Sequence, residues 1–287
     1  MKKFSALIAI FVIFTLSFNA NSIVTPGGTA SDLTKQYYNT SKDCGSDNKP
    51  AFLCSGVLLR GTIPSVSYHS WEPSPSSMLS GGVSFSYLRA DSKFKKLAYG
   101  YNNGLIFLPH NKIPQGKIES EVLCSFPIDA DSFNRGENGC GSHNKYPSIS
   151  KACQSMRILT AGAWKNHYTQ SSFEPHLRQC GFNIREGVDN NAFYFYESIR
   201  ARSLITSEAF AEQNELRLAT WKQGIGAKLP IQAFFYIKDG LRNAQYDQRD
   251  YYNNTGIFIP IVKITLPDRV SENAKFNFIH SDQVINP

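Results

Sequence analysis

The sequence lacks the short motifs that announce several common enzyme classes. It has no Gly-x-Ser-x-Gly turn to place a nucleophilic serine, no His-Glu-x-x-His helix and no glycine-rich phosphate loop ending in Lys-Ser or Lys-Thr. It also has no calcium-binding loop, internal repeat or low-complexity tract, and only one long apolar run. Nothing in these patterns therefore supports a serine hydrolase of the elbow type, a zinc protease or a P-loop nucleotidase.

The one long apolar run lies at the N-terminus. Two lysines precede the run over residues 4–18, and the small residues Ala20 and Ser22 follow it, which is typical of a cleaved export signal. The run spans about 15 residues, against the roughly 20 that a membrane-spanning helix needs. We therefore expect residues 1–22 to be a signal peptide removed near Ile23. The mature protein is expected to be secreted, extracellular or periplasmic, without stable membrane anchoring.

The cysteine pattern agrees with export. All six cysteines follow the predicted signal peptide, and an even number in an oxidising compartment favours disulfides. Their spacing forms three neighbouring pairs, which predicts the bonds Cys44–Cys54, Cys124–Cys140 and Cys153–Cys180. No Cys-x-x-Cys pair occurs and no histidine stands at ligand spacing beside a cysteine pair, so we expect neither a metal site nor a nucleophilic thiol.

Composition and charge narrow the class of protein. Hydrophobic residues make up 41% and aromatic residues 13% of the chain, as in an ordered globular protein. Loss of the signal peptide lowers the formal net charge of +7 by two, and the remaining basic residues are dispersed. We expect no nucleic-acid partner. Residues 23–287 are predicted to form a single α+β domain, with a possible subdivision near residues 130–150.

Hydrophobic periodicity changes near residue 130. Short β-type runs dominate before it, and capped helical patterns, beginning at Thr160, at Asp189 or Asn190 and at Ser207, come after it. The pattern predicts strands over residues 52–60, 83–88, 104–108 and 118–126, a loop over 129–150, helices over 160–167, 192–204 and 207–221, and strands over 231–237, 257–266 and 276–279. The predicted fold class is α+β, with a strand-rich N-terminal half, helices inserted before a late central strand, and disulfide-braced loops.

Two strands carry candidate binding residues. Arg60 ends a predicted strand and precedes Gly61, so its planar guanidinium is placed to clamp a phosphate or diphosphate, or simply to face water. Ser84 and Ser86 alternate along their strand, so both hydroxyls face the same side. They would brace a ligand or an arginine, or lie on the wet face of an edge strand.

Polar residues nearer the C-terminus supply candidate catalytic groups. If residues 213–215 are extended, Gln213 and Glu215 point the same way, and the carboxylate would stabilise positive charge developing on a ribose. The local pattern favours a helix, in which these two side chains do not face each other. A further polar and aromatic cluster, which either faces a substrate or forms an ordinary capped loop, consists of Tyr246, Asp247, Arg249 and Asp250.

Three segments resemble the secreted halovibrin group of Gram-negative bacteria. They are residues 53–62 (Leu-Cys-Ser-Gly-Val-Leu-Leu-Arg-Gly-Thr), 81–89 (Gly-Gly-Val-Ser-Phe-Ser-Tyr-Leu-Arg) and 212–218 (Glu-Gln-Asn-Glu-Leu-Arg-Leu), within a likeness that runs from about Tyr37 to the C-terminus. The resemblance implies an exported enzyme that cleaves NAD at the nicotinamide–ribose bond, as an NAD glycohydrolase or a mono-ADP-ribosyltransferase. NAD would be a substrate and not a bound cofactor, and a host acceptor protein would be a second partner.

The wider ADP-ribosyltransferase toxins imply roles for particular residues. They use an arginine on an early strand, a Ser-Thr-Ser strand, and a Glu or Gln two residues before the catalytic glutamate. These positions correspond to Arg60 as diphosphate anchor, Ser84 and Ser86 beside the nicotinamide ribose, and Gln213 with catalytic Glu215. The chain departs from the pattern at Phe85, which replaces threonine, and in the helix-like character of residues 212–218. With a different constellation, Glu212, Tyr246 or Asp247 would act in place of Glu215.

Two other functions remain open from the residues alone. The many tyrosines and a loop around Trp71, expected to be exposed, suit a non-catalytic secreted module that binds glycans or a host surface. A secreted hydrolase of another kind is the third possibility.

Overall fold

The computed structural model describes the part of the chain that forms the folded body. It covers residues 28–63, 67–75, 77, 83–108, 122–130, 139–140, 151–170, 179–205, 209–218 and 231–279. The predicted signal peptide, most of the loop predicted over 129–150 and the end of the helix predicted over 207–221 lie outside these residues. Within the described ranges, no helix has the length and apolar character required to cross a membrane.

A nine-stranded sheet organises the described residues. The strands are β1 (Val57–Gly61), β2 (Val83–Leu88), β3 (Asn103–Phe107), β4 (Val122–Phe126), β5 (Phe182–Asn183), β6 (Glu215–Leu218), β7 (Ile231–Tyr236), β8 (Ile261–Thr265) and β9 (Lys275–Phe278). Their order across the sheet is β5-β4-β6-β2-β1-β3-β7-β8-β9. Neighbours are antiparallel except β7 and β8, which run parallel and are joined through a helix, as a parallel connection requires.

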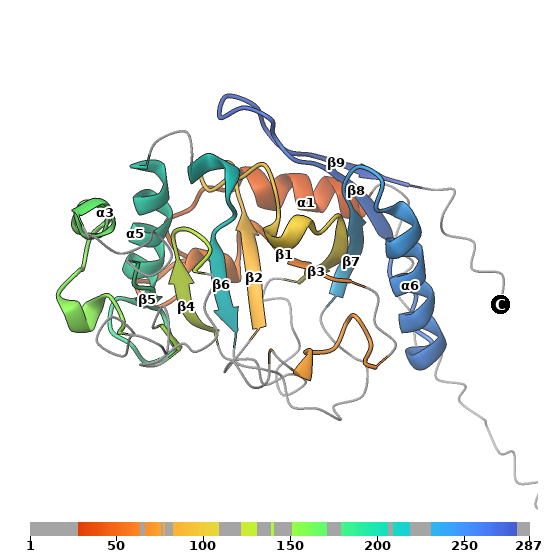
Figure 1. The fold of residues 1–287 in the computed structure, drawn as a ribbon, viewed down its shortest axis with the longest axis horizontal. Helices are drawn as coiled ribbons and strands as arrows, with labels where there is room; N and C mark the ends of the chain where they lie inside the picture. Colours follow the sequence, from red (N-terminus) through yellow and green to blue (C-terminus); the bar gives the residue numbers. More distant parts are fainter. Residues whose placement is uncertain are drawn as a thin grey trace, which may run out of the picture.

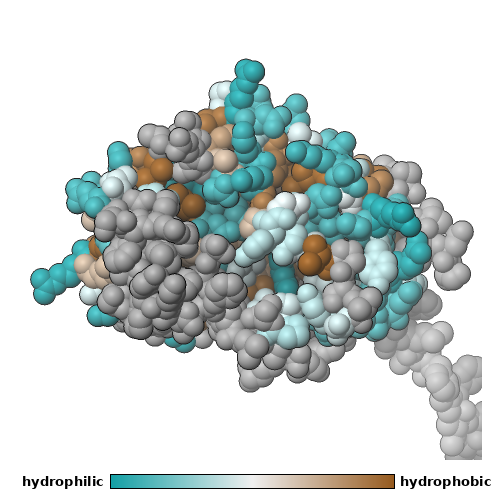
Figure 2. All heavy atoms as spheres, viewed as in Figure 1, coloured by the Kyte–Doolittle hydropathy of each residue, from teal (hydrophilic) through white to brown (hydrophobic). Residues whose placement is uncertain are grey.

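Four described α-helices cover the two faces of this sheet. They are α1 (Gly28–Tyr38), α3 (Ala161–Gln170), α5 (Asn191–Ser203) and α6 (Leu241–Thr255). One apolar cluster contains Leu33 and Tyr37 of α1, and a second contains Trp164 of α3, Phe195 of α5 and Tyr251 of α6. A third, smaller cluster includes residues 123, 124 and 126 of β4. Figure 1 shows α3 and α5 at the β4–β5 end of the sheet and α6 at the β7–β8 end. On the face drawn in Figure 2, apolar residues form separate small patches among hydrophilic ones.

The predicted fold class is confirmed, and most predicted strands occur where periodicity placed them. The strand predicted over residues 83–88 has the predicted bounds, and β8 lies within the late apolar run and pairs on both sides. The strand predicted over 52–60 begins instead with the 3-10 turn η1 (Ala51–Leu53). Helix α1 and the two-residue strand β5 were not predicted.

The helix predicted over residues 207–221 is wrong. A short 3-10 turn, η6 (Ala209–Ala211), is followed by strand β6. Polar and apolar residues alternate from Glu215 to Leu218, and β6 pairs with β2 on one side and β4 on the other. Two ladders of backbone hydrogen bonds therefore overrode the modest local preference for helix.

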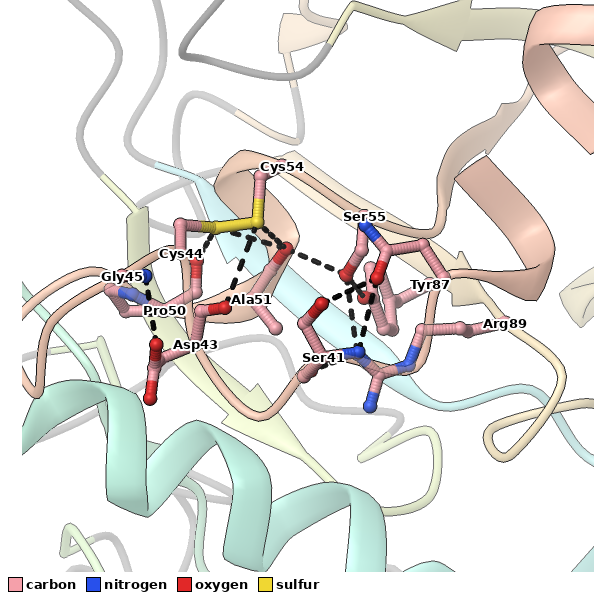
Figure 3. Close-up of a disulfide and its surroundings, with 11 residues drawn as sticks. Ser41, Asp43, Cys44, Gly45, Pro50, Ala51, Cys54, Ser55, Tyr87 and Arg89 are labelled. Carbon is pink, nitrogen blue, oxygen red and sulfur yellow. Dashed lines mark hydrogen bonds between the residues drawn. A yellow bond between two sulfur atoms is a disulfide. The ribbon is translucent and has the colours of Figure 1, made fainter. Parts of the chain in front are cut away.

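All three predicted disulfide pairings are confirmed. Their Cα atoms are 5.8 Å apart in Cys44–Cys54, 5.4 Å in Cys124–Cys140 and 5.1 Å in Cys153–Cys180, and no described cysteine is free. Near the first disulfide, the buried Arg89 donates to the Ser41 carbonyl at 2.7 Å and to Ser55 Oγ at 3.1 Å (Figure 3). Three disulfides fit a protein that folds in an oxidising compartment.

Removing single disulfides tests how they stabilise the fold. The Cys153–Cys180 bond closes a 27-residue separation and the Cys44–Cys54 bond a 10-residue one. Loop-closure entropy predicts losses of about 3.5 and about 2.7 kcal/mol in the free energy of unfolding for the two Cys→Ser double variants. Urea titrations of the three proteins measure both losses. A larger loss from removing the shorter loop would contradict the entropic account.

Candidate functional site

A hydroxyl–carboxylate pair joins β2 to β6. Ser84 Oγ donates to Glu215 Oε1 at 2.5 Å, and the Arg217 guanidinium donates to Ser84 Oγ at 2.7 Å and to Glu215 Oε1 at 3.3 Å. The backbone N–H of Ala130 donates to the other carboxylate oxygen at 3.1 Å. Ser84 has one hydroxyl proton, which it gives to Glu215, so it accepts from Arg217. Both oxygens of Glu215 thus receive hydrogen bonds that favour the ionised carboxylate.

A second side-chain contact continues this network along the same face. Ser86 Oγ donates to Gln213 Oε1 at 2.5 Å, and the backbone N–H of Ala98 donates to the same oxygen at 3.1 Å. The Gln213 amide then donates to Asp129 Oδ2 at 3.1 Å. Gln213 is buried, and these bonds use both ends of its amide group. In this structure Gln213 therefore holds two loops against the sheet.

The side chains of the site differ in how far they are buried. Glu215 is 1% exposed and Arg217 is 2% exposed, whereas Ser84 is only half-buried. On the α5 side, the crevice beside Glu215 leaves no room for a water molecule. The half-buried hydroxyl of Ser84 is thus the outer member of the Ser84–Glu215–Arg217 set, which we call the β2–β6 cluster.

Arg60 lies on a neighbouring strand but on the opposite face of the sheet. Leu59 is the ladder partner of Ser86, so these two side chains share a face. Successive residues of a strand alternate in direction, and Arg60 therefore points the other way, to the side of its partner Leu105. The structure brings Ser84, Ser86, Gln213 and Glu215 together and leaves Arg60 apart from them.

Arg60 instead contacts the loop that follows β1. Its guanidinium donates to the Glu72 carbonyl at 3.0 Å, and the Glu72 N–H donates to the His69 carbonyl at 2.9 Å. Burial lowers the pKa of Arg60 to about 10, and the neighbouring phenols of Tyr68 and Tyr101 oppose this shift. The side chain still carries its charge at neutral pH, and it anchors the turn over residues 69–72.

Asp247 of α6 is the other buried anchor on this side. It accepts from Thr62 Oγ1 at 3.0 Å, from Ser70 Oγ at 2.6 Å and from Asn103 Nδ2 at 2.9 Å. Burial raises the pKa of Asp247, the three donors counter part of the rise, and Asp250 adds to it. Asp247 therefore links Ser70 of the loop to Thr62 and Asn103 at the ends of β1 and β3.

Of the remaining candidate residues, Tyr246 and Glu212 lie at the surface and Trp71 is buried. Tyr246 is 54% exposed on α6, beside Asp247 in sequence but pointing outward. Glu212 forms a surface ion pair with Lys96 at 2.7 Å. The prediction that the loop around Trp71 exposes this side chain is wrong, because Trp71 is 4% exposed and donates its indole N–H to Asp250 at 2.9 Å.

Sequence reasoning missed two residues of these networks, Arg217 and His69, and placed Asp250 only in the polar cluster before the late apolar strand. A period-two reading of residues 215–218 would have placed Arg217 on the same face as Glu215. His69 and Asp250 are separated by 181 positions, and no local pattern relates them.

Comparison with protein-family models, with curated proteins and with solved structures finds no match to this chain. Among the described residues, no three His, Cys, Asp or Glu side chains gather so as to hold a metal ion.

Asp247 generates a test of pH dependence. Its pKa in the folded protein lies above the ordinary value of 3.8, so the folded state binds this proton more tightly than the unfolded chain. The group therefore contributes stability below pH 3.8, which is lost as the pH rises through the raised pKa. We therefore expect the unfolding free energy of the wild type, relative to that of Asp247→Asn, to decrease as the pH rises from 3.8 through the raised pKa. Denaturant titrations at several pH values measure it, and a difference independent of pH would contradict the assignment.

Proposed function

We propose that this protein is a secreted enzyme that cleaves NAD at the nicotinamide–ribose bond. The observation that carries the proposal is the Ser84–Glu215 hydrogen bond, with Gln213 two residues before the glutamate and in contact with Ser86. This is the juxtaposition of serine strand and glutamate strand that the resemblance to ADP-ribosyltransferase toxins requires. It exists because residues 215–218 form a strand and not the expected helix.

The proposed chemistry uses the negative charge of Glu215. Breaking the bond between the ribose carbon and the nicotinamide nitrogen leaves the electron pair on nicotinamide and positive charge on the ribose. A fixed carboxylate next to that charge stabilises the transition state, because its orientation is established before the reaction begins. Water then attacks the ribose carbon and loses a proton, or a side chain of a host acceptor protein takes its place.

Arg217 and Ser84 have positioning roles in this proposal. Arg217 directs the Ser84 hydroxyl toward Glu215 by donating to its oxygen, and its charge favours the ionised carboxylate. Substrate would approach from the half-buried Ser84 side. The Arg60 guanidinium would meet the diphosphate only if NAD extended around the end of β1 to the other face, so we leave it out of the proposed site.

The alternative of a non-catalytic binding module has less support. Trp71 is buried and so is not available to bind a glycan or a host surface. The exposed aromatic rings that could do so include those of Tyr99, which is 79% exposed, and Tyr246. Tyr99 adopts a left-handed backbone conformation, with φ of 54°, that costs energy in a non-glycine residue. Saturable binding to glycans, together with an absence of NAD turnover, would favour this function over catalysis.

The first functional prediction concerns Glu215. We expect the purified mature protein to release nicotinamide from NAD and Glu215→Gln to lose that activity, because a neutral amide provides no charge for the developing cation. Glu197 supplies a matched control, since it is also buried, accepts a backbone N–H from Ala161 at 2.6 Å and pairs with an arginine. Glu197→Gln should keep full activity.

Chromatographic quantification of nicotinamide measures both variants, and their melting temperatures show whether each is folded. A folded Glu215→Gln protein with wild-type turnover would remove Glu215 from the mechanism. No turnover by the wild type would refute NAD cleavage itself.

The second functional prediction concerns Arg217. Arg217→Gln removes the cation that orients the Ser84–Glu215 pair, so we expect kcat to fall about 10-fold or more with little change in KM. Arg200, which pairs with Glu197 at 2.7 Å, offers the matched control Arg200→Gln with wild-type kcat. Steady-state kinetics with NAD gives both constants, and an increase in KM at constant kcat would instead make Arg217 a substrate-binding residue.

A further inference from the structure

Three consecutive side chains fasten the loop after β1 to one turn of α6. His69 Nδ1 lies 2.6 Å from Asp250 Oδ2, Ser70 Oγ donates to Asp247 Oδ1 at 2.6 Å, and Trp71 Nε1 donates to Asp250 Oδ2 at 2.9 Å. Asp247 and Asp250 are three residues apart, which places both carboxylates on one side of the helix. The Ser70 and Trp71 bonds, together with the Arg60 bond to the Glu72 carbonyl, already fix this loop without the histidine.

The contact with Asp250 determines which nitrogen of His69 carries a proton. A carboxylate only accepts, so Nδ1 holds the proton and a neutral His69 presents the lone pair of Nε2. The ring stacks on Trp71, with centroids 4.6 Å apart and planes 11° apart. The His69 side chain is 38% exposed, and no polar group in the described part of the chain bonds Nε2. A basic nitrogen is thus held in a fixed direction at the surface.

The surroundings of His69 select an uncharged substrate. The Asp250 carboxylate contacts the His69 ring directly, and Asp247, one turn before it on α6, bonds the next residue of the loop, Ser70. Two carboxylates beside the ring disfavour phosphate esters and other anions. The exposed ring of Tyr246 lies one helical turn before Asp250, on the same side of α6, and offers an apolar surface.

We propose that His69 is a catalytic general base, and Asp250 its positioning residue, in a second site that hydrolyses uncharged carboxylic esters. Nε2 takes a proton from water as the water oxygen forms a bond to the ester carbonyl carbon. The tetrahedral intermediate then breaks its bond to the alcohol oxygen, which receives the same proton from Nε2. Ester and water become acid and alcohol, and no further reactant is consumed. The nucleophile in this proposal is water, which needs no further side chain.

This site is separate from the proposed NAD site. His69 belongs with Arg60 and Asp247 on the α6 side, whereas Ser84 and Glu215 lie on the opposite face of the sheet. The two proposals therefore fail or succeed independently, and nicotinamide release is measured beside ester hydrolysis in every variant.

The probe is p-nitrophenyl acetate, an uncharged activated ester, hydrolysed by the purified full chain. We expect His69→Gln to reduce the catalysed rate about 100-fold, the usual contribution of a general base, and Asp250→Asn to reduce it less. His167, the other described histidine, lies on α3, and His167→Gln is the matched control with wild-type rate. Equal rates in the His69 and His167 variants would overturn the proposal.

A measurement on the unaltered protein covers the case in which a variant does not fold. Hydrolysis should slow in deuterated water, since a proton moves in the rate-determining step. Equal rates in the two solvents, or no hydrolysis above that of free imidazole at the same concentration, would overturn the proposal.

Discussion

The pairing of β6 between β2 and β4 is the constraint on which the rest of the site depends. Strand β6 has only four residues, yet it forms a ladder on each side and so joins β4 and β5 to the remainder of the sheet. Its two leucines enter the core below α5, and its two charged residues face the other way. The same alternation that satisfies the core therefore places Glu215 and Arg217 side by side against Ser84.

Buried charge in this protein consistently serves to fix loops. Arg60, Arg202 and Asp247 each lose most of their solvent and recover hydrogen bonds from the backbone or side chains of distant segments. Burial lowers the pKa of Arg202 to about 10, as it does for Arg60, and both remain cations at neutral pH. Such groups are costly to bury and more costly to leave without their partners. The described segments that these three groups contact are consequently anchored to the sheet, which a preorganised site requires.

Sequence reasoning recovered what local pattern and chemistry determine. The alternation of residue types along the strand predicted β2, and the late apolar run predicted β8. The spacing of the cysteines, in a chain expected to reach an oxidising compartment, predicted all three disulfides. Sequence reasoning failed at residues 212–218, where a short strand is stabilised by partners about 90 to 130 positions away, beyond any local window. The Ser84–Glu215 contact could be predicted only if residues 213–215 were taken as extended. The face of the sheet on which Arg60 lies could not be predicted without the register of β1 against β2. The His69–Asp250 contact depends on tertiary packing alone.

The disulfides have a consequence for how the chain is made. Each joins a cysteine to the next one along the sequence, and no loop closed by one bond contains another. A chain threaded N-terminus first into an oxidising space offers its thiols in that same order. An oxidase that joins each newly arrived thiol to the one still waiting would produce only native bonds, so thiol–disulfide reshuffling would have nothing to correct. Residues 231–279, which supply α6 and the last three strands, would then dock onto a body whose covalent frame is already closed.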